Sequence, residues 1–167
     1  MSGWQEGGEI ESLVTEGLLS EKISSFTLAP PLVVESGTSV SDVVKQIQER
    51  GVGYVLVCNN GRLTGIMTER DVLLKIVARD VDYSDKVDSF MTPDPVTLTN
   101  ESTVGDAIAL MIDRNFRNVP IVNSDTREPL AVFSVRHVID YLTESFPEQV
   151  MNLPPRPHQK MTTREGG

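Results

Sequence analysis

Two side chains with the chemistry to bind a ligand, Thr68 and Asp71, follow a short apolar run that starts at Gly65. The run reads as a strand passing into a helix, so both residues stand where free backbone amides and a partial positive charge favour phosphate oxygens. Thr68 can add a hydroxyl donor, and the Asp71 carboxylate can accept two hydrogen bonds from adjacent sugar hydroxyls. The same spacing is that of a capping box, which only starts a helix. Both interpretations stay open at this point.

Catalytic and metal-binding groups are scarce. Cys58 is the single cysteine, and His137 and His158 are the only histidines. The sequence therefore offers few residues for a catalytic cysteine–histidine pair or for a zinc site. Aspartates at positions 80, 82 and 85 could attract a cation, but they lack the glycine and the final glutamate of a calcium loop. We therefore expect no enzyme activity, no catalytic cofactor and no bound metal.

Charge and hydropathy narrow the class of partner. The 167 residues carry a formal charge of −9 with a pI near 4.7, so the positive field that gathers nucleic acid or an anionic membrane is missing. No run of about 18 apolar residues is present, and residues 1–9 lack the features of a secretory signal. We expect a cytoplasmic protein that binds neither nucleic acid nor membrane.

The sequence contains an internal repeat. A shift of 64 positions aligns residues 23–59 with residues 87–123 without a gap. Both copies carry apolar residues at i, i+3, i+4 and i+7, starting from Val40 and from Val104, which predicts an amphipathic helix in each. Ser39 and Thr103 precede these helices as capping residues. Two β-rich runs and a second helix follow in each copy, so each unit is predicted as strand, helix, strand, strand, helix. The second helix of the first copy is expected over residues 68–78, with Val72, Leu73, Ile76 and Val77 on its apolar face.

The ends of the chain differ from the repeat. Residues 9–23 have apolar residues at helical spacing, which predicts a leading helix that packs on the first unit. The last residues are rich in proline and poor in apolar side chains, which favours an extended or disordered tail. We expect a leading extension over 1–19, a first unit over 20–82, a second unit over 83–145 and a Pro-rich tail over 146–167.

Three segments carry a family resemblance: FMTPDPVTL at 90–98, NVPIV at 118–122 and GIMTERD at 65–71. With the repeat, they make residues 20–145 resemble a tandem pair of CBS domains, also called a Bateman module. The resemblance implies an α+β fold of two β-α-β-β-α units packed sheet to sheet, and two such modules paired as a homodimer. It also implies a regulatory, energy- or metabolite-sensing role through adenine-nucleotide binding, acting on an unidentified regulated protein.

The resemblance further implies a nucleotide site, with phosphate contacts from arginines and the base between apolar strand residues. The nucleotide-binding residues so predicted are Thr68, Asp71, Arg70, Arg117, Arg136, Val33, Tyr54 and Val55. AMP is the favoured ligand, ADP and ATP are alternatives, and NAD and S-adenosylmethionine are less favoured. Each arginine could instead be a solvated surface residue, and each apolar residue could be ordinary core.

The second unit departs from the pattern. Ala131 stands in place of the glycine and His137 in place of the carboxylate, although Ser134 keeps the hydroxyl. Imidazole accepts one hydrogen bond when neutral and none when charged, so it is a poor partner for ribose. Opposite this site stands Gly53 rather than an arginine. We expect a second, degenerate site at Ser134 and His137; the alternative for the whole protein is a ligand-free structural dimerisation module.

Overall fold

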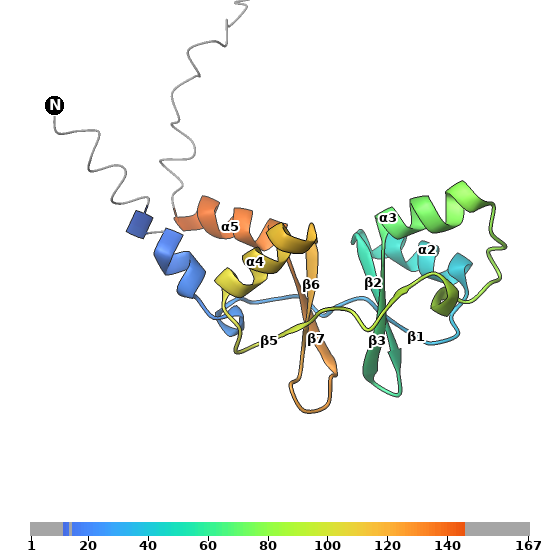
Figure 1. The fold of residues 1–167 in the computed structure, drawn as a ribbon, viewed down its shortest axis with the longest axis horizontal. Helices are drawn as coiled ribbons and strands as arrows, with labels where there is room; N and C mark the ends of the chain where they lie inside the picture. Colours follow the sequence, from blue (N-terminus) through green and yellow to red (C-terminus); the bar gives the residue numbers. More distant parts are fainter. Residues whose placement is uncertain (1–11, 14, 146–167) are drawn as a thin grey trace, which may run out of the picture. The chain divides into compact units, whose positions relative to one another are not determined.

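The computed structural model describes residues 12–13 and 15–145. The predicted Pro-rich tail and residues 1–11 of the leading extension lie outside the described residues. Figure 1 labels the larger elements along the chain. Their bounds are η1 Ile23–Ser25, β1 Val33–Glu35, α2 Val40–Arg50, β2 Tyr54–Asn59, β3 Arg62–Thr68, α3 Glu69–Asp71, η2 Val72–Ile76, η3 Val77–Arg79, η4 Val87–Ser89, β4 Thr92–Pro93, β5 Leu98–Thr99, α4 Val104–Arg114, β6 Asn118–Val122, β7 Pro129–Ser134 and α5 Val135–Ser145.

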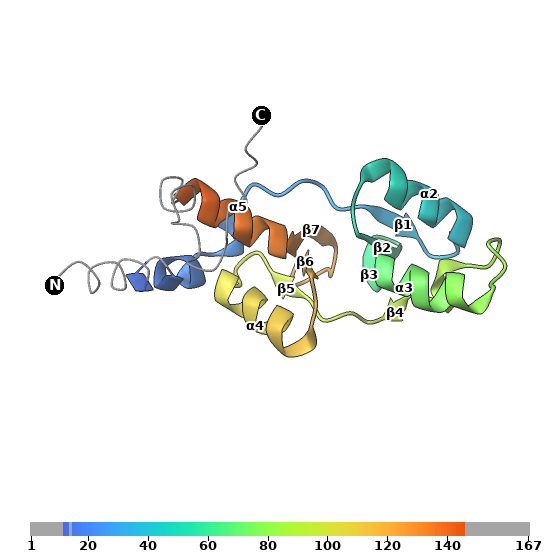
Figure 2. The same ribbon diagram turned by 90° about the horizontal axis from the view of Figure 1, so that it is seen from above.

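Two sheets are present, one for each copy of the repeat. In the first, β1 pairs parallel with β2, β2 antiparallel with β3, and β3 antiparallel with β4, which lies beside it in Figure 2. In the second, β5 pairs parallel with β6, and β6 pairs antiparallel with β7. Asn60 and Gly61 join β2 to β3 with φ angles of 52° and 80°, as the tight hairpin turn requires. The α+β fold of two repeated units is confirmed.

The first helix of each repeat is also as predicted. Ser39 caps α2 by accepting a hydrogen bond from the Asp42 amide at 3.2 Å, and Thr103 forms a reciprocal capping box with Asp106 at the start of α4. Helix α2 packs on β2, and α4 packs on β6. Local side-chain hydrogen bonds therefore set the start of both helices.

The second helix of the first repeat differs from the prediction. A continuous helix over 68–78 is expected from the sequence, but the chain forms a short α-helical turn, α3, then a π-helical segment, η2, and a 3-10 turn, η3. The wider π-helical turn changes which side chains face the sheet. Ile76 is buried, whereas Leu73 and Val77 are 59% and 57% exposed. The prediction that Leu73 and Val77 belong to a buried face is wrong.

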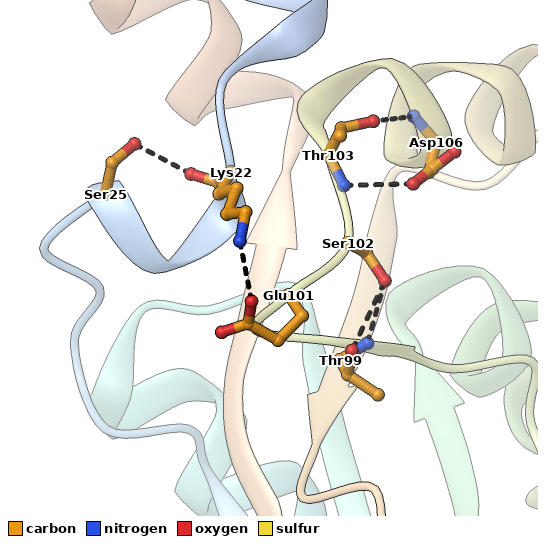
Figure 3. A network of polar contacts seen from close by, with 7 residues as sticks. All are labelled: Lys22, Ser25, Thr99, Glu101, Ser102, Thr103 and Asp106. Carbon is orange, nitrogen blue, oxygen red and sulfur yellow. Dashed lines mark hydrogen bonds and ion pairs between the residues drawn. The ribbon is translucent and has the colours of Figure 1, made fainter.

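Two equivalent stretches, residues 21–26 and 85–90, cross between the repeats; we call them the crossing segments. The amide of Ile23 donates to the Ser102 carbonyl at 2.9 Å, and the amide of Val87 donates to the Thr38 carbonyl at the same distance. Each crossing segment thus lies at the start of the other repeat's first helix. Figure 3 shows the first crossing, where Lys22 forms an ion pair with Glu101 at 2.8 Å.

The leading helix therefore packs differently from the prediction. Residues 12–13 and 15–20 are helical, as expected. A Cβ placed on Gly105 would lie 2.9 Å from the Leu19 carbonyl, and the Phe26 ring meets Phe133 edge-on at 5.4 Å. These contacts are with α4 and β7 of the second repeat, so the expectation of packing on the first unit is wrong. The reason is the crossing, which carries the chain before residue 27 over to the other repeat.

The two sheets share one core. Buried residues of the first repeat, such as Leu56 and Leu63, form a single apolar cluster with Val122 and Val132 of the second sheet. Polar contacts also join the two repeats. The amide of Leu63 donates to the Arg127 carbonyl at 3.1 Å, and the Arg127 guanidinium contacts Asp94 at 2.8 Å. The sheets therefore face each other, as the resemblance implies.

The described chain divides into two compact units that meet between Val135 and Arg136. The first unit contains both sheets and the helices up to α4. In the second, the α5 residues after Val135 are helical, and Arg136 pairs with Asp140 at 3.5 Å on the exposed helix surface.

Candidate functional site

Thr68 and Asp71 lie at the point where β3 ends and α3 begins. The Thr68 amide and hydroxyl both donate to Asp71 Oδ2, at 2.9 and 3.0 Å, and the Asp71 amide donates back to Thr68 Oγ1 at 3.4 Å. This is a complete capping box, so the structural interpretation of the spacing is confirmed. The nucleotide interpretation of the same two residues stays a prediction.

The structure adds one residue to this site, Lys75. Its ammonium lies 3.1 Å from Asp71 Oδ1, and the two side chains are 32% and 18% exposed. The same ammonium donates to the carbonyl of Phe90 at 3.0 Å. Lys75 is not among the residues predicted from the sequence, although an Asp and a Lys four residues apart in a helix are a recognisable ion-pair spacing.

These contacts limit what the site can offer a ligand. The Thr68 hydroxyl has a single proton, and it already donates a hydrogen bond to Asp71 through it. The hydroxyl must therefore rotate away from Asp71 before it can donate to a phosphate. Asp71 is different, because a carboxylate has about four acceptor positions. The Thr68 amide and hydroxyl occupy Oδ2 and the Lys75 ammonium occupies one position on Oδ1, so the carboxylate keeps about one position, on Oδ1, for a further donor.

The three apolar residues predicted to contact the base occupy different environments. Successive residues of a strand point to opposite faces, so Tyr54 and Val55 of β2 cannot line the same surface. Val55 is fully buried, whereas Val33 on β1 is 36% exposed. Tyr54 is 9% exposed, and its burial raises the pKa of its hydroxyl. Of the three, Val33 has the most surface for a ligand, and Val55 has none in this structure.

The ion pair of Asp71 in the described structure is with Lys75, and none of the three predicted arginines takes part in it. Arg70 on α3 and Arg117 before β6 are both exposed. The Arg117 carbonyl accepts the amide of Val135 at 3.2 Å, at the start of the second repeat's own helix. Arg136 belongs to the second compact unit, where it pairs with Asp140. Their phosphate-binding role stays a prediction.

The second repeat uses the same backbone arrangement with other side chains. The amide of Glu69 donates to the Gly53 carbonyl at 3.1 Å, and Val135 and Arg117 form the equivalent bond. Ser134 closes β7 and His137 lies in α5, both partly exposed. Ser134 and His137 belong to different compact units, and the degenerate site expected from them stays a prediction.

Other chemistry is sparse in the part of the chain that the structure describes. No group of three metal-ligating side chains occurs among those residues. Asp82 accepts the amide and hydroxyl of Ser84, which lowers the pKa of its carboxyl and ties it into a turn. Burial, followed by the charges of Glu35 and Glu128, raises the pKa of the Cys58 thiol to about 11, which disfavours the nucleophilic thiolate.

A hollow of about 470 Å³ lies on the first crossing segment, lined by residues such as Gly17, Ser20 and Lys22, away from Thr68 and Asp71. Two of its serines already donate to nearby carbonyls, Ser20 to that of Gly17 and Ser25 to that of Lys22. Within residues 12–13 and 15–145, no helix is long and apolar enough to cross a bilayer. The cytoplasmic location stays a prediction.

Comparison with solved structures supports the fold. The CBS domain protein from Pyrobaculum aerophilum complexed with AMP is similar, with a TM-score of 0.66 and 22% identity, covering 74% of this chain and 99% of that one. The CBS domain pair of protein MJ0100, in complex with 5′-methylthioadenosine and S-adenosyl-L-methionine, has a TM-score of 0.68 and 19% identity, covering 75% and 98%.

Comparison with curated sequences gives the family. An uncharacterised 17.7 kDa protein of Acidianus ambivalens is 30% identical over 108 residues, which are 64% of this chain and 65% of that protein. The chain spans only 16% and 17% of the length of two other relatives. The model of the CBS domain family matches twice, at residues 23–78 and 87–144. The two matches cover most of the chain, which therefore belongs to the CBS domain family as a tandem pair.

Proposed function

We propose that this protein is a regulatory module that binds one adenine nucleotide at the first repeat, with Asp71 as the ribose-binding residue. The observation that carries the proposal is the Asp71 carboxylate, which is held at a helix start and keeps about one free acceptor position on Oδ1. AMP is the favoured ligand, and ADP or ATP are alternatives. Structural neighbours that bind AMP, or methylthioadenosine and S-adenosylmethionine, support an adenosine ligand without deciding among them.

The proposed geometry follows from the residues already described. The ribose hydroxyls donate to Asp71, the base lies against Val33 and Tyr54, and Arg70 and Arg117 reach the phosphate. Arg117 is the test of the phosphate contact, because arginine forms strong charge-assisted hydrogen bonds with phosphate. Arg117→Ala is expected to weaken AMP binding by about 1–3 kcal/mol. An unchanged affinity would assign Arg117 to the solvated surface.

The central test is Asp71→Asn, measured by calorimetric titration with AMP, ADP, ATP, NAD and S-adenosylmethionine. Asparagine keeps one acceptor for the Thr68 amide but loses the carboxylate, so nucleotide affinity is expected to fall by about 1–3 kcal/mol. The chain contains a matched control: Asp106 forms the same capping box with Thr103, with the amide-to-carboxylate distance again 2.9 Å. Asp106→Asn is expected to lower the melting temperature slightly and leave nucleotide affinity unchanged.

A ligand-free dimerisation module is the second candidate, and one observation favours it. Both oxygens of Asp71 already have partners within the chain, so its conformation needs no ligand. On this interpretation Asp71→Asn lowers the melting temperature, while no nucleotide in the panel raises it. Under the proposed function, specific binding raises the apparent stability of the wild type by RT ln(1 + [L]/Kd).

Both candidates include a homodimer, and the regulatory candidate adds a regulated partner protein. Leu73, Leu74 and Val77 form an exposed apolar strip along η2 and η3, each at least 50% exposed. An apolar strip of this kind on a small protein favours a protein contact. Light scattering at micromolar concentration should give twice the chain mass of 18.4 kDa. A mass of one chain would count against the dimer.

A further inference from the structure

Lys75 contacts two parts of the molecule that the proposed function does not connect. Its ammonium lies 3.1 Å from Asp71 Oδ1 and 3.0 Å from the Phe90 carbonyl. Asp71 belongs to the proposed ligand site, whereas Phe90 belongs to the second crossing segment, which leads into the second repeat. One partly buried cation thus bridges the site and the connection between the repeats.

The crossing segment is held tightly around Phe90. The amides of Phe90 and Met91 both donate to the Val87 carbonyl at 2.9 Å, and both side chains pack against the core of the first repeat. The Met91 side chain fills the space over Gly65, where a Cβ would overlap its sulfur. The Lys75 ammonium adds a charge-assisted hydrogen bond to this packing, which is stronger than one between neutral groups.

The bridge is a property of the first repeat. At the positions that correspond to Asp71 and Lys75, the second repeat has His137 and Tyr141, which cannot form the same carboxylate–ammonium pair. Lys75 also lies within the π-helical segment η2, whereas α5 is a regular α-helix. Single π-helical turns are often found at functional sites.

We propose that Lys75 is a positioning residue that couples occupancy of Asp71 to the mobility of the crossing segment around Phe90. The two ribose hydroxyls need two acceptor positions, and Asp71 Oδ1 has about one free, so the second hydroxyl competes with the ammonium for that oxygen and displaces Lys75 from its present position. The Phe90 carbonyl then loses its charged partner, and the amides of Phe90 and Met91 open more often. The ligand part of this coupling rests on the proposed function.

The first experiment needs no ligand: amide hydrogen exchange of the full chain, followed at Phe90 and Met91. Lys75→Met keeps most of the stem and removes the charge, and Asp71→Asn removes the anion that helps to hold it. Each is expected to speed exchange at Phe90 and Met91 by about fivefold, with β2 unchanged. The double variant should be no faster than Lys75→Met alone, because both changes act through one contact.

Lys45→Met is the matched control. Lys45 also pairs with an acid four residues away, Glu49 at 3.9 Å, but both side chains are more than 60% exposed and belong to α2. This variant should leave exchange at Phe90 and Met91 as in the wild type. If Lys75→Met also behaves as the wild type there, or speeds exchange in β2 to the same extent, the positioning role of Lys75 is overturned.

The second experiment adds AMP at saturation. Exchange at Phe90 and Met91 is expected to rise about threefold or more in the wild type and to show no further response in Lys75→Met, with AMP at a concentration that saturates each variant by its own titration. If AMP binds and the wild-type segment does not respond, the coupling is overturned while the proposed function stands. If the ligand-free variants behave as expected but no nucleotide binds, the proposed function fails while the Asp71–Lys75–Phe90 contact stands.

Discussion

The two repeats share a backbone hydrogen bond at the start of the second helix, but the side chains around that bond differ. At the start of the second helix, Glu69 bonds to Gly53 in one repeat, and Val135 bonds to Arg117 in the other, at 3.1 and 3.2 Å. Only the first repeat adds a carboxylate and a cation to this frame, through Asp71 and Lys75. A duplicated backbone therefore keeps its shape while its side chains diverge, so ligand chemistry has to be judged repeat by repeat.

The crossings show a similar divergence. Asp88 on the second crossing segment accepts hydrogen bonds from the Ser36 hydroxyl and from the Gly37 amide at 2.6 Å. The first crossing instead uses Lys22, which pairs with Glu101, and both of those side chains are more than half exposed. One crossing is thus fixed by hydrogen bonds to a carboxylate and the other by a solvated ion pair. Their contributions to stability should differ accordingly.

The largest effect is expected at Gly65, whose counterpart in the second repeat is Ala131. A methyl group on Gly65 would overlap the Met91 side chain, so Gly65→Ala should destabilise the fold by about 1–3 kcal/mol through overpacking. The melting temperature should fall by about 2–4 °C per kcal/mol. Met91→Ala combined with Gly65→Ala should recover part of the loss relative to Met91→Ala alone. An unchanged melting temperature for Gly65→Ala would mean that Met91 moves aside freely.

Asp88→Ala should have the next largest effect on stability. It removes both hydrogen bonds to the turn at Ser36 and Gly37, so urea unfolding is expected to show a loss of about 1–2 kcal/mol at neutral pH. Asp88→Asn, which retains one acceptor, should lose less. Equal losses for the two variants would contradict the role assigned to the carboxylate.

The Asp88 contribution should depend on pH. Burial alone would raise the pKa of Asp88, but the bonds from Ser36 and Gly37, together with Lys86, bring it below its ordinary value of 3.8. A carboxyl with a lowered pKa in the folded state stabilises the fold above 3.8 and loses that contribution as the pH falls through the folded-state value. The stability difference between wild type and Asp88→Ala should therefore shrink from pH 7 to pH 3. A constant difference would argue against a stabilising role of the ionised Asp88 carboxylate.

The smallest effect is expected at the first crossing. Lys22→Met removes an exposed ion pair, which is worth about 0–1 kcal/mol, and added salt should reduce even this difference. Comparing unfolding of Lys22→Met and Asp88→Ala in the same buffer tests the contrast between the crossings. A loss at Lys22 equal to that at Asp88 would show that the two crossings are held equally.

Much of the fold was predictable from residues close together in sequence. The caps at Ser39 and Thr103 and the hairpin turn at Asn60 and Gly61 depend on neighbours within a few positions. The capping box of Thr68 and Asp71 was recognised for the same reason. The exposed faces of Leu73 and Val77 were missed, because a π-helical turn shifts the helix phase without a clear local signal.

The sequence by itself determined the repeat, the order of its elements and the two candidate side chains, since these follow from periodicity, caps and turns. Only the tertiary structure decided the rest. The crossing segments, the full burial of Val55 and the contact of Lys75 with Phe90 bring together parts of the chain that are distant in sequence or covered by other elements. Such contacts depend on how the two sheets share one core, and no local pattern of residues encodes that packing.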